Sequence, residues 1–120
     1  MQTFRNFLTL GANEAVVTGI RRALGYQQIT VTVAVKLTIP TVQVPSNPGG
    51  YAQQVSPGFA IIQCNGGNVR WRDDGVAPTA SVGMTLAAGA ELDYTGDINN
   101  IQFILSSGTP IIDVSLYGGV

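Results

Sequence analysis

The stretch Gln28–Ile39, QITVTVAVKLTI, alternates strictly between two kinds of residue. Its odd-numbered positions are all Ile, Val or Leu, whereas Gln, Thr, Ala and Lys occupy the even-numbered positions. Successive side chains of a β-strand point to opposite faces, so this period of two predicts one long strand with one buried face. Many of its residues are β-branched, which favours the same structure, and Pro40 should end the strand.

Shorter candidate strands follow at close intervals. They cover residues 58–64, 68–72, 81–86, 90–96, 101–105 and 111–117. Segments typical of turns separate them: NGGN, DDG, AAGA, TGDINN and SSGTP. Only residues 15–26 offer a helical turn, which their two glycines disfavour. Many short strands separated by turns predict an all-β fold, either an antiparallel β-sandwich or a jelly-roll-like barrel.

The whole chain of 120 residues fits a single β domain. Residues 1–14 are expected to form an extended N-terminal segment, as a first strand or as an arm on a neighbour. Residues 40–58 form a long Pro/Gly-rich connection, and loops of that length usually have a function or contact a partner. The N-terminus lacks the apolar core of a signal peptide, and no apolar stretch approaches the ~20 residues of a membrane span, so we expect synthesis in the cytoplasm and no membrane partner.

Charged residues make up only 11% of the chain, against about 25% in an average soluble domain. The formal net charge is −1 and the six Lys and Arg residues are spread along the sequence, which argues against nucleic-acid binding. A free monomer normally has a well-charged surface. The composition therefore suits a surface covered by neighbouring chains, or a β domain with an uncharged polar surface.

The residue types needed for most catalytic and metal sites are missing from the sequence. It has no histidine and one cysteine, so Ser-His-Asp and Cys-His catalysis and most zinc sites are excluded. Cys64 lies in the apolar run FAIIQC and is interpreted as a buried hydrophobic residue. Glu91, Asp93 and Asp97 offer either calcium ligands or, as we prefer, an exposed strand face followed by an Asp-initiated turn. We expect no enzyme activity, cofactor, metal or small-molecule substrate.

The most concentrated group of charges surrounds the single tryptophan, in the order Arg70, Trp71, Arg72, Asp73, Asp74. On a strand, the two arginines share one face and the tryptophan faces the core on the other side. Arg and Asp at this spacing form bidentate hydrogen bonds that brace a loop or bind a neighbouring subunit. The segment is therefore predicted to be a structural corner or an intersubunit interface, because Arg and Trp are typical of interface hot spots.

The segment VRWRDDGVAPTASVGMTLAAGAELDYTGDINNIQFILSSGTPIIDVSLY, residues 69–117, resembles a pattern in small virion structural proteins of tailed bacteriophages. Its parts are a WRDDG corner, a PTAS-G segment, an L-AG-EL-YTGD hairpin and a terminal V-Y strand. Residues 1–67 lie outside the resemblance.

The resemblance implies a protein of the mature particle, most simply a capsid decoration or cement protein on the capsid surface. Its partners would be the major capsid protein and further copies of itself, with a trimer as the preferred homo-oligomer. The alternative is a tail or baseplate component that contacts host glycans through exposed aromatic residues, drawn from Tyr26, Tyr51 and Tyr117.

Overall fold

The computed structural model describes residues 21–40, 42–45 and 52–119, and strands are the only regular elements in these ranges. The strands are β2 (Arg21–Thr30), β3 (Val35–Lys36), β4 (Val42–Pro45), β5 (Ala52–Val55), β6 (Phe59–Arg72), β7 (Met84–Leu86), β8 (Glu91–Tyr94) and β9 (Gln102–Gly119). All of their pairings are antiparallel, which confirms the predicted all-β fold. The predicted N-terminal segment, residues 1–14, lies outside the described residues.

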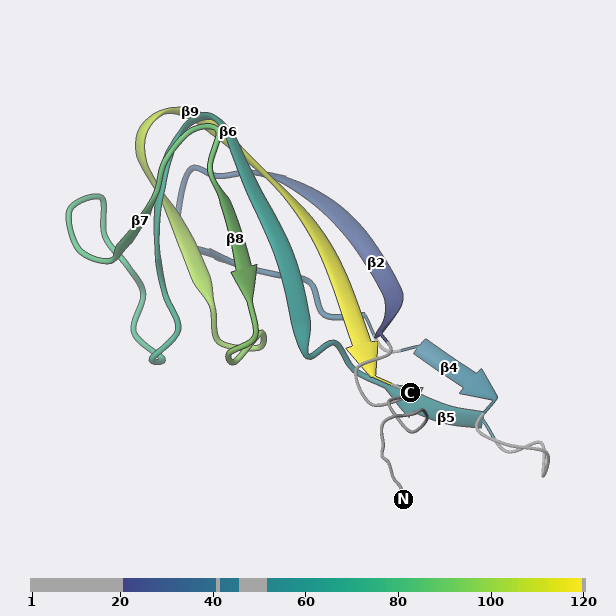
Figure 1. Ribbon diagram of the computed structural model, residues 1–120. Helices are drawn as coiled ribbons and strands as arrows, with labels where there is room; N and C mark the ends of the chain where they lie inside the picture. Colours follow the sequence, from purple (N-terminus) through teal and green to yellow (C-terminus); the bar gives the residue numbers. More distant parts are fainter. Residues whose placement is uncertain (1–20, 41, 46–51, 120) are drawn as a thin grey trace, which may run out of the picture.

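One six-stranded sheet forms the body of the protein. Its order is β2-β9-β6-β7, with β3 added to β9 and β8 added to β6. The long strands β6 and β9 arch together, so that the sheet folds over and its two halves descend on either side of the bend (Figure 1). Both halves contribute to a single cluster of buried residues, so the arched sheet encloses one core.

Glycines allow the two central strands to bend at the same place. Gly66 and Gly108 have φ angles of 81° and 72°, and the pairing of β6 with β9 shifts register on each side of Gly67. A Cβ atom on Gly67 would lie 2.4 Å from the carbonyl oxygen of Ser107, so only glycine fits there. The segments NGGN and SSGTP were predicted to be turns between separate strands, and this is wrong: they are bulges within continuous strands.

The bulges also keep one face of each strand directed toward the core. On β6 the buried side chains are those of Ala60, Ile62 and Cys64 before the bend and Val69 after it, so the buried positions change from even to odd numbers. A bulge adds one residue to a strand, so the residues after it that point to the inner face are the odd-numbered ones instead of the even-numbered ones. The strand thereby keeps one face toward the core through the arch. Among the described residues, the largest fully buried side chain is that of Phe103 on β9.

The predicted long strand over residues 28–39 is shorter in the structure. Its first part belongs to β2, which ends at Thr30; a bend at residues 32–33 follows, and β3 then pairs with the opposite end of β9. Val31 and Leu37 are buried as predicted, whereas Val33 in the bend is 73% exposed. The bend lets one segment cover both halves of the arch, which a straight strand would not reach.

Two further segments, residues 21–26 and the 40–58 connection, differ from their sequence-based predictions. Residues 21–26, part of the candidate helical turn, lie in β2, where Leu24 is buried against Val55. The 40–58 connection is not irregular throughout, because β4 and β5 pair within it as a separate two-stranded sheet. In the described ranges, no helix is long and apolar enough to cross a membrane.

Candidate functional site

The predicted charged corner lies at the end of β6, where the chain leaves the sheet and returns through β7. Trp71 pairs with Met84 and Val69 with Leu86, so the loop formed by residues 73–83 is closed at its base by strand pairing. Arg70 and Arg72 alternate with Trp71 along the strand, as the sequence predicts. The five residues from Arg70 to Asp74 thus surround one corner, and each has a separate structural role.

Arg70 holds the returning end of the loop. Its Nε donates a hydrogen bond to the carbonyl oxygen of Ala80 at 3.1 Å, and its Nη1 donates to that of Gly83 at 3.0 Å. The hydroxyl of Ser106 donates to the same Ala80 carbonyl at 3.2 Å. Because a guanidinium group presents its donors in a fixed fork, these bonds fix the position of the loop backbone relative to the sheet.

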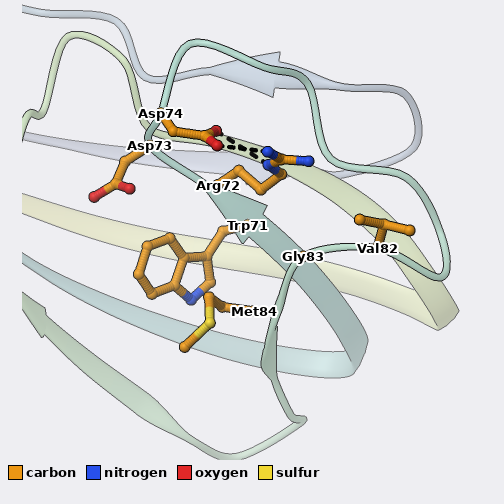
Figure 2. Close-up of a pocket in the computed structure, with 7 residues that line it drawn as sticks. All are labelled: Trp71, Arg72, Asp73, Asp74, Val82, Gly83 and Met84. Carbon is orange, nitrogen blue, oxygen red and sulfur yellow. Dashed lines mark hydrogen bonds and ion pairs between the residues drawn. The ribbon is translucent and has the colours of Figure 1, made fainter.

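Arg72 and Asp74 form an exposed, bidentate ion pair at the start of the loop. Arg72 Nε donates to Asp74 Oδ1 at 3.0 Å, and Nη2 donates to Oδ2 (Figure 2). The guanidinium group holds the pKa of the Asp74 carboxyl below its ordinary value. This pair closes the tight turn before Gly75, whose φ is 85°.

Trp71 and Asp73 are both joined to Tyr94 on β8. The Trp71 and Tyr94 rings meet edge to face, with centroids 5.8 Å apart and an interplanar angle of 75°. The Tyr94 hydroxyl donates a 2.6 Å hydrogen bond to Asp73 Oδ2. Burial and then this hydrogen bond to a carboxylate raise the pKa of Tyr94 well above its ordinary value. The corner is thereby tied to β8 as well as to β7.

A hollow of about 550 Å³ opens between the loop and the sheet (Figure 2). Trp71, Val82 and Met84 supply its apolar lining, and Arg72, Asp73 and Asp74 lie around it. Val82 is 51% exposed and Met84 is 60% exposed. Val76, in the same loop, is also largely exposed. At the hollow, Val82 and Met84 therefore present exposed apolar side chains bordered by charges.

The structure brings the five predicted residues together at the corner. It adds Val82, Met84 and Tyr94, whose place beside them the sequence did not reveal. The alternation in SVGMTL predicts that Val82, Met84 and Leu86 share one face of a strand, but only Leu86 is buried. Nothing in the local pattern distinguishes a buried from an exposed Met84, because the distinction depends on where the loop returns. Tyr94 was predicted to face inward, and it does, but its bond to Asp73 crosses 21 positions in sequence.

A second polar group lies on the outer face of the sheet. Asp113 on β9 accepts hydrogen bonds from the Tyr26 hydroxyl at 2.7 Å, the Gln28 amide at 2.9 Å and the Asn65 amide at 3.2 Å. These donors lower the pKa of Asp113, and the hydrogen bond from Tyr26 has the largest effect. Of the three predicted aromatic candidates, Tyr26 is 66% exposed, Tyr117 is partly buried beside Phe59, and Tyr51 lies outside the described residues.

The carboxylates considered as calcium ligands do not converge. Glu91 and Asp93 are exposed on β8, and Glu91 accepts a hydrogen bond from Gln63. Asp97 instead accepts bonds from the backbone of Asn99 and the side chain of Asn100, as in an Asp-initiated turn. Among the described residues, no group of three or more His, Cys, Asp or Glu side chains is placed to hold a metal ion.

No family model, curated protein or solved structure matches the chain.

Proposed function

We propose that this chain is a non-enzymatic structural protein of a tailed-bacteriophage particle, most simply a capsid decoration protein that bridges capsid subunits on the virion surface. The sequence resemblance over residues 69–117 motivates the assignment to a virion. The observation that carries the mode of action is the pair of exposed apolar side chains that line the hollow at the corner, Val82 and Met84. Exposed apolar patches with polar borders are typical of protein–protein contact sites.

The corner is suited to binding because its shape is fixed before contact. Arg70 secures the returning loop through two carbonyl groups, and Arg72 and Asp74 close the turn that begins it. A surface that is already ordered loses little conformational entropy on binding. In the proposal, an apolar side chain of the major capsid protein enters the hollow beside Trp71 and Met84.

Weak individual contacts are sufficient for this role. A decoration protein occurs in many copies, and contacts across adjoining subunits act together, so each bridge needs to contribute only a few kcal/mol. The low charge of the chain agrees with this role, since it limits the desolvation cost of covering the surface.

Particles assembled without the chain test the proposal. They should release their DNA at a lower temperature than complete particles, and adding back the purified wild-type chain should restore resistance. Val82→Asp should fail to restore it because the charge enters the apolar hollow. Val33→Asp, which places the same charge at another exposed valine in the bend after β2, should restore it. Equal heat resistance of particles with and without the chain would contradict the proposal.

The alternative function is a tail or baseplate protein that contacts glycans. The exposed Tyr26 ring beside the Asp113 carboxylate favours it, because sugar rings pack on aromatic faces while their hydroxyls bond to carboxylates and amides. Copy number distinguishes the alternatives. Hundreds of copies in a purified particle, measured by quantitative mass spectrometry, support the capsid, and a dozen or fewer support the tail.

A further inference from the structure

Among the described residues, the strands at the edges of the sheet differ greatly in length. At three of its edges the outermost strand is short: β3 has two residues, β7 three and β8 four. At the fourth edge lies β2, with ten residues. Because an unpaired strand edge is a template for pairing with another strand, proteins usually shorten or obstruct their edges. In the described part of the chain, β2 is the exception.

The register of β2 shows which backbone groups face away from the sheet. The Val31 N–H donates to the carbonyl oxygen of Pro110 at 3.0 Å, immediately beyond the pairing of Thr30 with Ile111. Antiparallel strands use alternate residues for each neighbour. Val31, Ile29 and Gln27 therefore direct their backbone groups toward β9.

The outward set consists of Tyr26, Gln28 and Thr30. Within residues 21–40, 42–45 and 52–119, no backbone partner meets their N–H and C=O groups, because β2 pairs with β9 alone. The segment that follows β3 also leaves this edge open. It reaches β2 through the Gln27 side chain, which bonds to the Thr38 backbone at 2.8 and 2.9 Å.

This edge lacks most of the features that discourage pairing. No proline, lysine or other charged residue occurs from Ala23 to Thr30. A single bulge lies between Ala23 and Gly25, and the six residues Gly25–Thr30 pair with β9 in unbroken register. Those six residues provide a regular, uncharged edge.

We infer that the outer edge of β2 pairs antiparallel with β2 of a second copy of this chain, about a two-fold axis at Gln28, so that the two sheets become continuous. An antiparallel edge is complementary to itself, as an isologous contact requires. Opposed residues must also lie on the same face of the sheet. With Gln28 on the axis, Tyr26 lies opposite Thr30 of the partner subunit. The outward backbone N–H and C=O groups of all three residues then form hydrogen bonds with the second copy of β2.

Charge and side-chain pairing favour the same arrangement. Arg22 lies near the beginning of β2, so antiparallel copies place the two Arg22 residues beyond the paired region and at opposite ends. Parallel copies would set these like charges side by side, which is unfavourable. On the outer face, the exposed Tyr26 ring is brought next to a threonine, and pairs of aromatic and β-branched residues stabilise sheets.

The solution mass of the full chain tests the inference. Sedimentation equilibrium at several concentrations should give twice the chain mass of 12.6 kDa for the wild type. Gln28→Pro should reduce the mass to that of one chain, because proline removes an outward N–H and leaves the bonds to β9 intact. Gln28→Ala is the matched control: it removes the same side chain but keeps the N–H, and it should remain dimeric.

Cross-linking tests the register separately and does not depend on the folding of a proline variant. In a Cys64→Ala background, Gln28→Cys should form an intermolecular disulfide under mild oxidation, since two residues on the axis lie within disulfide reach. Thr85→Cys, exposed on β7, should not. A monomeric wild type, or an oligomer that Gln28→Pro leaves intact, would overturn the inference, as would a Gln28→Cys variant that does not cross-link.

This inference replaces the trimer expected from the sequence resemblance with a two-fold dimer, and it rests on the proposed function only for its biological role. The two fail in distinguishable ways. A monomeric chain that still restores heat resistance would overturn the pairing alone, and a dimer missing from particles would overturn the virion function alone.

Discussion

The Tyr94 hydroxyl donates a 2.6 Å hydrogen bond to Asp73, so β8 is joined directly to the loop that carries the exposed apolar corner. The same ring contacts Trp71 edge to face. One buried residue therefore fixes both the tryptophan and the first acidic residue of the corner.

Tyr94→Phe should lower the free energy of unfolding by about 1–2 kcal/mol, because it removes a hydrogen bond to a charged group and keeps the ring contact. Tyr26→Phe removes a similar bond to Asp113 from an exposed tyrosine, so it should cost only a few tenths of that amount. Urea denaturation of both variants measures the difference. Equal losses would show that the Tyr94 bond has no special structural role.

The stability of the wild type should fall as the pH rises above about 10, the ordinary pKa of tyrosine. Burial of Tyr94 and its bond to Asp73 raise its pKa in the folded state, so the folded chain retains a proton that the unfolded chain releases. The stability that Tyr94 contributes is therefore complete below about pH 10 and is lost as the pH rises above that value. Tyr94→Phe should show a shallower alkaline decline in urea denaturation; an unchanged slope would exclude Tyr94 as its source.

Replacement of Arg70 should be more damaging than replacement of Arg72. Arg70→Ala leaves the Gly83 carbonyl group without its side-chain donor and leaves the Ala80 carbonyl with the Ser106 hydroxyl alone, so it should cost about 1–3 kcal/mol. Arg72→Ala breaks an exposed ion pair that solvent screens, so it should cost less than Arg70→Ala. Thermal denaturation of the two variants gives the comparison. A greater loss for Arg72→Ala would contradict the role assigned to Arg70.

Gly67→Ala should strongly destabilise the protein, by more than about 3 kcal/mol, because its Cβ would overlap the backbone of β9. Gly58→Ala is the control, since a Cβ there meets no atom within 4 Å. Urea denaturation should show a change within about 0.5 kcal/mol for the control. If Gly67→Ala were equally mild, the close approach of β6 and β9 at the arch would be excluded.

The sequence was sufficient to predict the all-β fold because alternation is a local property of a strand. Leu92 and Tyr94 face inward in β8 as their spacing predicts, and Cys64 is buried. The positions of the strand ends were predicted less well. Gly66 and Gly108 were interpreted as turns, since glycine with positive φ occurs in hairpin turns and in bulges alike. Only the pairing of the two strands distinguishes these possibilities.

The site was predictable to the same extent. The spacing of Arg72 and Asp74 allowed the bidentate pair to be expected, because both residues lie within one turn. The contacts of Arg70 with Ala80 and Gly83 depend on the path of a loop that carries no periodic signal. The exposure of Met84 depends on the same path, so the apolar corner could be recognised only in the folded chain.

Cryo-electron microscopy of the proposed bacteriophage particle tests the central claim, which is our proposal that the chain acts by packing against other proteins. The account predicts density for the arched sheet at many equivalent positions on the capsid, with the Val82–Met84 corner against a capsid subunit. Particles whose capsid and tail contain no such density would contradict it.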